Sequence, residues 1–144
     1  MVDQIIIGFV WTLVTIGVGV AFIVALMESV PYIFRHLDGL PRFVCDTGIL
    51  LLSVLWLFVG IGVIVLAWAS LFVWRGEFYD FGTALYFAVV SVTTVGYGDV
   101  IVSEKARLLA GFAAADGFLI FGLYTAALYE VISRLKSDGS NKRA

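Results

Sequence analysis

The amino-acid sequence predicts an all-α membrane protein with three transmembrane helices and one shorter, re-entrant helix. Of its 144 residues, 62% are hydrophobic and 14% are charged, and the mean hydropathy is +1.06. These values are typical of integral membrane proteins and unlike those of soluble domains. Three apolar stretches are each long enough to cross about 30 Å of hydrocarbon, and a fourth is too short to do so. We therefore expect a single domain that folds within a membrane.

The first apolar stretch, residues 5–27, carries no charge and is long enough to span the membrane. The alternative is the apolar part of a cleaved signal peptide. Its only early charge is Asp3, it lacks a basic N-terminal region, and it is long for such a segment. We therefore expect a retained transmembrane helix.

The connector that follows, residues 28–47, contains three basic residues and is interrupted by Pro31 and Pro41. With the first span it makes up residues 1–47, which we interpret as an N-terminal transmembrane helix and a cytoplasmic connector. The connector is either a helix lying on the membrane surface or a plain polar loop, and the sequence favours neither. The surface helix is suggested by apolar residues at helical spacing: Ile33, Leu37, Leu40 and Val44.

The other two long stretches have different characters. Residues 49–74 are uncharged, and Trp68 and Trp74 near their end are expected to be interfacial anchors. Residues 107–132 carry a carboxylate, Asp116, in their interior. Both stretches are predicted to span the membrane.

A shorter apolar segment, residues 79–93, lies between these two spans. It cannot cross the membrane and is typical of a re-entrant helix, for which Asp80 or Thr83 would cap the N-terminus. Residues 48–136 then form one membrane module, and residues 137–144 are expected to be a disordered tail.

The distribution of basic residues predicts the orientation in the membrane. Cytoplasmic loops carry an excess of Lys and Arg. One side would hold six of them (Arg35, Arg42, Arg134, Lys136, Lys142 and Arg143) and the other side three (Arg75, Lys105 and Arg107). We therefore expect the N-terminus and the re-entrant segment on the outside and the C-terminus in the cytoplasm.

Residues 93–100 read Thr-Thr-Val-Gly-Tyr-Gly-Asp-Val, an unusual string inside a membrane protein. Glycine readily adopts positive φ, so alternate peptides can flip and point successive carbonyl oxygens to one side. The Thr94 hydroxyl adds one more oxygen. The alternative is a glycine-rich turn between two helices. Such a turn should lie outside the membrane, whereas this string follows an apolar half-span, so we favour a backbone that itself binds a ligand.

This string resembles the selectivity filter of pore-loop potassium channels. A second string, Phe-Gly-Leu-Tyr-Thr-Ala-Ala-Leu at residues 121–128, is similar to the end of the inner helix in the small bacterial type with one pore module per chain. The resemblance covers residues 49–135 and extends to short bacterial proteins with an additional N-terminal helix, but the family pattern explains nothing in residues 1–47. It implies a homotetramer embedded in the lipid of a plasma membrane, expected to be a bacterial inner membrane. The activity implied is passive conduction of K⁺.

Carried over residue by residue, the resemblance assigns roles to two groups. The first is a candidate filter, residues 94–98, in which K⁺ is bound by main-chain carbonyls and Gly98 turns the chain outward at the mouth. The carbonyl ligands are those of Thr94, Val95, Gly96 and Tyr97. The second group belongs to the inner helix, with a hinge at Gly117 and a cavity lined by Phe118, Phe121 and Thr125.

The sequence departs from the family at one position of the re-entrant helix. The best-known bacterial relatives have a glutamate there that pairs with the filter aspartate, whereas this chain has Val90. Asp99, which would support the filter, therefore needs another partner. Tyr86, one turn earlier, is the candidate donor, and we expect a Tyr86–Asp99 hydrogen bond.

Asp116 is expected to be functional, because a carboxylate at the centre of a span costs about 2.5–3.5 kcal/mol. Facing the cavity, it would concentrate cations and promote block from inside. Facing away, it would hydrogen-bond the re-entrant helix, through Ser91 or a threonine. If Phe118 lines the cavity, Asp116 lies about 160° from it around the helix, which favours the second position.

Other functions find less support in the sequence. No set of catalytic residues is evident, so we do not expect an enzyme or an organic cofactor. Cys45 is the single cysteine, which excludes an internal disulfide. One cysteine and one histidine in the whole sequence are too few for a transition-metal site. A net charge of −2 gives no reason to expect a nucleic-acid partner. Two alternatives stay open: the pore subunit of a K⁺ transporter and a non-conducting partner of another channel.

Overall fold

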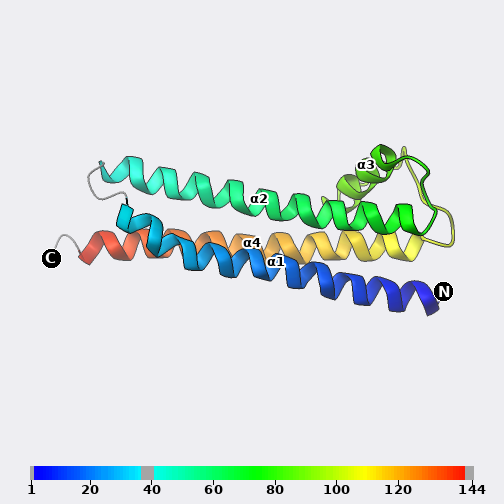
Figure 1. Cartoon of the computed structure of the whole chain (residues 1–144), viewed down its shortest axis with the longest axis horizontal. Helices are drawn as coiled ribbons and strands as arrows, with labels where there is room; N and C mark the ends of the chain where they lie inside the picture. The colour runs from blue at the N-terminus through cyan, green and yellow to red at the C-terminus, as the bar shows by residue number, and fades with distance from the viewer. Residues whose placement is uncertain (1, 37–40, 142–144) are drawn as a thin grey trace.

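The computed structural model describes residues 2–36 and 41–141, apart from the side chains of residues 31, 33–36, 42 and 138–141. The described residues form four helices and no strand: α1 (Val2–His36), α2 (Arg42–Trp74), α3 (Phe81–Val92) and α4 (Arg107–Asn141) (Figure 1). Three are long and apolar enough to cross a membrane, over Val2–Val30, Phe43–Trp74 and Arg107–Ser137, and α3 is a shorter apolar helix. The predicted all-α class with three spans and one short helix is confirmed.

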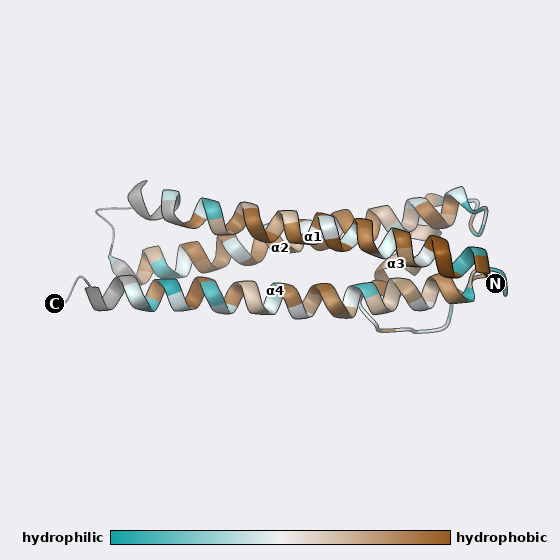
Figure 2. Ribbon diagram, turned by 90° about the horizontal axis from the view of Figure 1, so that it is seen from below, coloured by the Kyte–Doolittle hydropathy of each residue, from teal (hydrophilic) through white to brown (hydrophobic). Residues whose placement is uncertain are grey.

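The three long helices lie side by side, and α3 is inclined against one end of α2 (Figure 1). The N-terminus lies at the same end as α3 and the loop after it, whereas the C-terminus and the start of α2 lie at the opposite end. Hydrophobic residues dominate the middle of the bundle and hydrophilic ones gather toward its ends (Figure 2). The candidate filter and the N-terminus therefore lie at the same end of the bundle, which agrees with the predicted topology.

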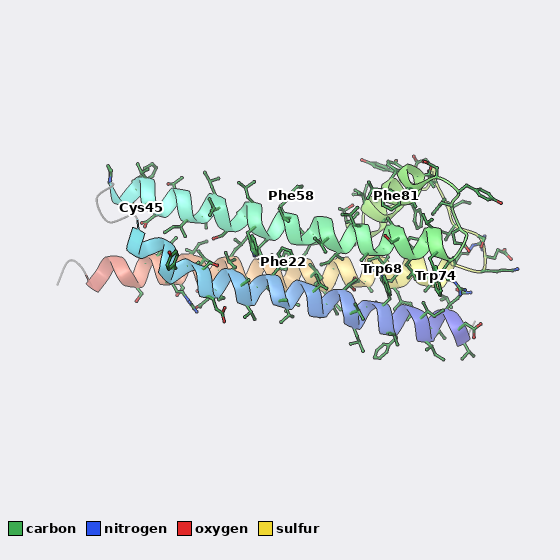
Figure 3. The ribbon with its side chains drawn as sticks, viewed as in Figure 1. Phe22, Cys45, Phe58, Trp68, Trp74 and Phe81 are labelled. Carbon is green, nitrogen blue, oxygen red and sulfur yellow. The ribbon has the colours of Figure 1, made fainter. Side chains whose placement is uncertain are left out.

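The buried core lies where α1, α2 and α4 meet, and Trp68 belongs to it. The prediction that Trp68 is an interfacial anchor was wrong, because its side chain has no exposed surface, while Trp74 is 76% exposed. In Figure 3, Trp68 lies between α2 and the helices beside it. Burial is possible here because the indole N–H has a partner inside the bundle, described below. The ring of Phe72 lies beside that of Trp68, with centroids 5.9 Å apart and the ring planes tilted by 33°. Phe72 also packs edge-on against Phe87 of α3.

The connector between the first two spans is neither a surface helix nor a plain loop over its described part. Helix α1 runs on to His36 and α2 begins at Arg42, while residues 37–40 lie outside the described residues. Helix α1 passes through Pro31, which has no N–H to donate to the carbonyl of Met27 four residues earlier. The Arg134 guanidinium of α4 donates to that carbonyl instead, over 3.5 Å. A donor from a neighbouring helix thus replaces the bond that proline removes.

The prediction of a disordered tail from Ser137 was also wrong for the described residues. Helix α4 continues to Asn141, and residues 142–144 lie outside the described part of the chain. Extending an existing helix adds a hydrogen bond for each residue fixed, and only its nucleation is costly. Glu130 and Arg134 add an i, i+4 ion pair at 2.8 Å near this end.

A glycine ends α2 and thereby sets the start of the re-entrant segment. Gly76 has φ +73°, its N–H bonds the carbonyl of Val73, and the Glu77 N–H bonds that of Phe72. This pair of bonds is the Schellman arrangement, which requires a left-handed residue just past the helix. The chain therefore reverses here and leads into α3.

Candidate functional site

Helix α3 is fixed at its start by Asp80, the first of the two predicted caps. The Asp80 carboxylate accepts a hydrogen bond from the Thr83 N–H at 2.8 Å and another from the Thr83 hydroxyl at 3.1 Å. These bonds favour the charged form and lower the pKa of Asp80. A negative charge at this position also complements the helix dipole.

The end of α3 leads into the candidate filter through a set of backbone hydrogen bonds. The Thr94 N–H donates to the Ser91 carbonyl at 2.9 Å. The N–H groups of Val95 and Gly96 both donate to the Val90 carbonyl, at 3.1 and 3.2 Å. The donors at the start of the candidate filter are therefore directed back toward α3.

The backbone of the candidate filter alternates in handedness. Thr94, Gly96 and Gly98 have φ of 59°, 60° and 77°, and they are separated by residues with negative φ. Such alternation turns successive carbonyl oxygens toward one side of the chain. Within the described residues, the carbonyls of residues 94–98 accept no hydrogen bond. The segment thus presents a row of free oxygen ligands.

Sequence reasoning did not anticipate the positive φ of Thr94. A β-branched residue pays about 1–2 kcal/mol in the left-handed region. Its N–H bond to the Ser91 carbonyl helps to hold it there. Strain of this kind persists only where the surrounding structure enforces it, and it is typical of ligand-binding segments.

The predicted hydrogen bond between Tyr86 and Asp99 is present. The Tyr86 hydroxyl donates to an Asp99 carboxylate oxygen at 2.7 Å, which ties α3 to the loop just past Gly98. Val90, at the position of the family's glutamate, is buried and apolar. The bond from Tyr86 is the main reason why the pKa of the Asp99 carboxyl is lowered.

Replacing Tyr86 by phenylalanine is expected to raise the pKa of Asp99 toward its ordinary value. The hydrogen bond stabilises the carboxylate, so its contribution is present above the pKa of the unfolded chain and is lost as pH falls through the lower folded value. A carboxyl ¹³C NMR titration would measure this shift. The ion current should also decay faster, because the loop after Gly98 loses the hydrogen bond that connects it to α3.

Tyr79→Phe is the matched control, because Tyr79 is fully exposed. It should change neither the Asp99 titration nor the current. If Tyr86→Phe left conduction and its decay as they are in the wild type, Asp99 would not be supported by Tyr86.

Sequence reasoning missed a second hydrogen-bonded contact of the loop between α3 and α4. The Glu77 carboxylate accepts two hydrogen bonds from Ser103, one from its N–H and one from its hydroxyl, each at 3.0 Å. Glu77 follows α2 and Ser103 precedes α4, so the pair joins the two ends of the re-entrant segment. The partners are 26 residues apart, and no motif or spacing links them.

Asp116 faces away from the side of α4 on which the cavity residues were predicted, but its partners differ from those expected. It is fully buried, and one carboxylate oxygen accepts bonds from the Thr15 hydroxyl at 2.6 Å and from the Trp68 indole N–H at 2.7 Å. The expected bond to Ser91 or to a threonine of the re-entrant helix was wrong. Helices α1 and α2 cover this face of α4, so they supply the donors.

This burial predicts the effect of Asp116→Asn on block from inside. A charge that does not reach the cavity cannot concentrate blocking cations there, so block by internal Mg²⁺ or polyamine should stay within about twofold of the wild type. Single-channel recording with these cations on the cytoplasmic side would measure it. A large loss of block would place Asp116 in the cavity.

The other inner-helix residues lie in two environments. Gly117 is buried against the end of α3, where an added Cβ would collide with the Val92 carbonyl. Phe118 is 73% exposed, and Phe121 and Thr125 are also exposed in the single chain. Helix α4 continues unbroken through Gly117. The hinge and the cavity lining stay predictions.

Comparison with known proteins supports a pore module. One relative, the TWiK family of potassium channels protein 18 of Caenorhabditis elegans, is 41% identical over 58 residues, which is 40% of this chain and 11% of the relative. Another, the calcium-gated potassium channel TvoK of Thermoplasma volcanium, is 33% identical over 67 residues, 46% of this chain and 19% of the relative. The chain therefore spans less than a fifth of either protein. No solved structure matches.

A match to a family model covers more of the chain. It runs over residues 60–134, from within α2 through α3 and the candidate filter to the C-terminal part of α4. These are the elements that present the row of carbonyl oxygens and hold it in place. The family is one of channels and not of enzymes. The chain therefore belongs to the ion channel family Ion_trans_2.

Proposed function

We propose that this protein is a potassium-selective channel, in which four copies surround one pore and conduct K⁺ passively. The observation that carries the proposal is the alternation of φ at residues 94, 96 and 98, which leaves successive carbonyls free to bind a cation. Rings of such oxygens replace the hydration shell of K⁺. Several weak sites in a row let an entering ion displace those ahead of it.

Exposed backbone supports assembly of several chains. Residues 94–99 are all exposed in the single chain, and they follow a short, predominantly apolar helix. Irregular backbone at membrane depth is tolerated only where it is buried in protein or lines an aqueous path. One loop per chain cannot enclose such a path, so further copies must complete it. A fourfold ring is the arrangement that the resemblance to potassium channels implies.

The relatives and the membrane topology agree with this proposal. Both relatives are named as potassium channels, although the matched regions are short parts of them. We place the chain in a plasma membrane, in contact with lipid, with the N-terminus and filter outside and the C-terminus in the cytoplasm. K⁺ is then the permeant ion, with no organic cofactor and no nucleic acid involved.

Flux through purified protein in liposomes tests the proposal against its rivals. A channel should give fast K⁺ uptake that excludes Na⁺ and is blocked by Ba²⁺. Slow, saturable uptake would indicate a transporter subunit, and no uptake would indicate a non-conducting partner. The mass of the detergent-solubilised assembly should equal four chains, and a different number would refute the tetramer.

A further inference from the structure

We propose that Thr15 of α1, together with Trp68 of α2, is a positioning residue for the filter. Through Asp116 the two donors hold α4 against the end of α3, just before the filter begins. This role rests on the proposed channel function. It would explain the presence of the first span, which the sequence pattern of potassium channels does not explain.

The contact between the three helices is a single buried carboxylate oxygen. It accepts from Thr15 at 2.6 Å and from Trp68 at 2.7 Å, and the exposed fractions of the three side chains are 1%, 0% and 0% for Thr15, Trp68 and Asp116. Hydrogen bonds to a charged or strongly polar group in a dry interior are costly to leave unmade. Losing either donor should therefore release Asp116 from its place.

Asp116 is adjacent to a close contact between α4 and α3. The next residue, Gly117, lies so near the Val92 carbonyl that no side chain fits between them. Val92 is the last residue of α3, and Thr94, two residues on, is the first residue of the candidate filter. A displacement of Asp116 would therefore also displace the end of α3, which leads directly into the first residues of the candidate filter.

Helix α1 packs closely against α4 both before and after Thr15 in the sequence. An added Cβ on Gly8 would meet the Phe112 ring, and one on Gly19 would meet Ile120. Small residues in a helix interface let neighbouring helices pack closely in a membrane. The Thr15–Asp116 bond therefore lies in a tight seam, where a lost hydrogen bond cannot be replaced by bulk water.

Thr15→Val tests the role, because valine keeps the shape of threonine and removes the hydroxyl. We expect the open probability of the filter to fall by about tenfold, the effect of losing one buried hydrogen bond. Raising external K⁺ should largely restore it, because bound K⁺ stabilises the filter carbonyls. A purely structural role in helix packing would not respond to K⁺. Thr15→Ser, which keeps the hydroxyl, should behave as the wild type.

Thr12→Val is the matched control. Thr12 lies on the same helix, and its hydroxyl is buried with no partner among the described residues. Its loss should leave open probability unchanged. In an Asp116→Leu background, Thr15→Val should add no further effect, because the acceptor is already gone.

Amide hydrogen exchange separates failure of this inference from failure of the proposed function. Thr15→Val should speed exchange at Thr94 and Val95 by about tenfold, whether or not the protein conducts. If the wild type conducts K⁺ but Thr15→Val and Thr12→Val are indistinguishable in current and exchange, the positioning role is refuted. If the wild type does not conduct selectively, the channel proposal fails, and the exchange rates alone decide whether Thr15 positions this segment.

Discussion

Gly117→Ala is expected to prevent assembly of a conducting protein. The added methyl group would collide with the Val92 carbonyl, which belongs to the end of a helix and cannot rotate away as a side chain would. Overpacking of this kind costs about 1–3 kcal/mol, and in the proposed tetramer it occurs four times, about 4–12 kcal/mol in all. We expect K⁺ flux to fall below detection and the thermal midpoint of the assembly to drop by several degrees.

A control glycine on the same helix makes this experiment specific. Gly111 has no described atom within 4 Å of an added Cβ, so Gly111→Ala should be neutral or slightly stabilising, since alanine favours helix. The comparison also separates packing from a hinge. Loss of a hinge alone would alter gating and leave thermal stability intact. Wild-type stability and flux in Gly117→Ala would show that α3 and α4 do not make this close contact.

Features set by local composition were the ones that sequence predicted well. The three spans and the short helix follow from runs of apolar residues, which need no partner to be recognised. The bond from Tyr86 to Asp99 could also be predicted, because the two lie only 13 residues apart and the resemblance to potassium channels indicates that the filter aspartate pairs with the re-entrant helix. The length and pattern of the segment between them fix how near they come.

Features that depend on a distant partner could not be predicted. Helix α1 continues through Pro31 because Arg134, more than a hundred residues away, donates to the carbonyl left free at Met27. The donors to Asp116 and the burial of Trp68 were missed for the same reason, since their common contact joins three helices. Helical spacing gave the side of α4 on which Asp116 lies, but only the packing of α1 and α2 revealed its donors.

The left-handed backbone at Gly96 makes Gly96→Ala the second substitution with a large expected effect. Gly96 has φ +60°, and no described atom lies within 4 Å of an added Cβ, so the cost arises in the backbone itself. An L-residue pays about 1–2 kcal/mol in this conformation, about 4–8 kcal/mol over four chains. If residue 96 relaxed to a negative φ, this cost would be avoided, but one carbonyl oxygen would turn away from the row that the candidate filter presents.

Either outcome removes a ring of oxygen ligands, so we expect K⁺ uptake into liposomes to fall by at least about a hundredfold, or Na⁺ to enter as readily. Gly62→Ala, in α2 with no described atom near its added Cβ, should transport as the wild type does. D-alanine at position 96, introduced by semisynthesis, provides the decisive comparison. Its mirror-image preference favours positive φ, so it should restore selective K⁺ uptake although it adds the same methyl group. Equal loss with L- and D-alanine would mean that the space around residue 96, and not the handedness of its backbone, controls conduction.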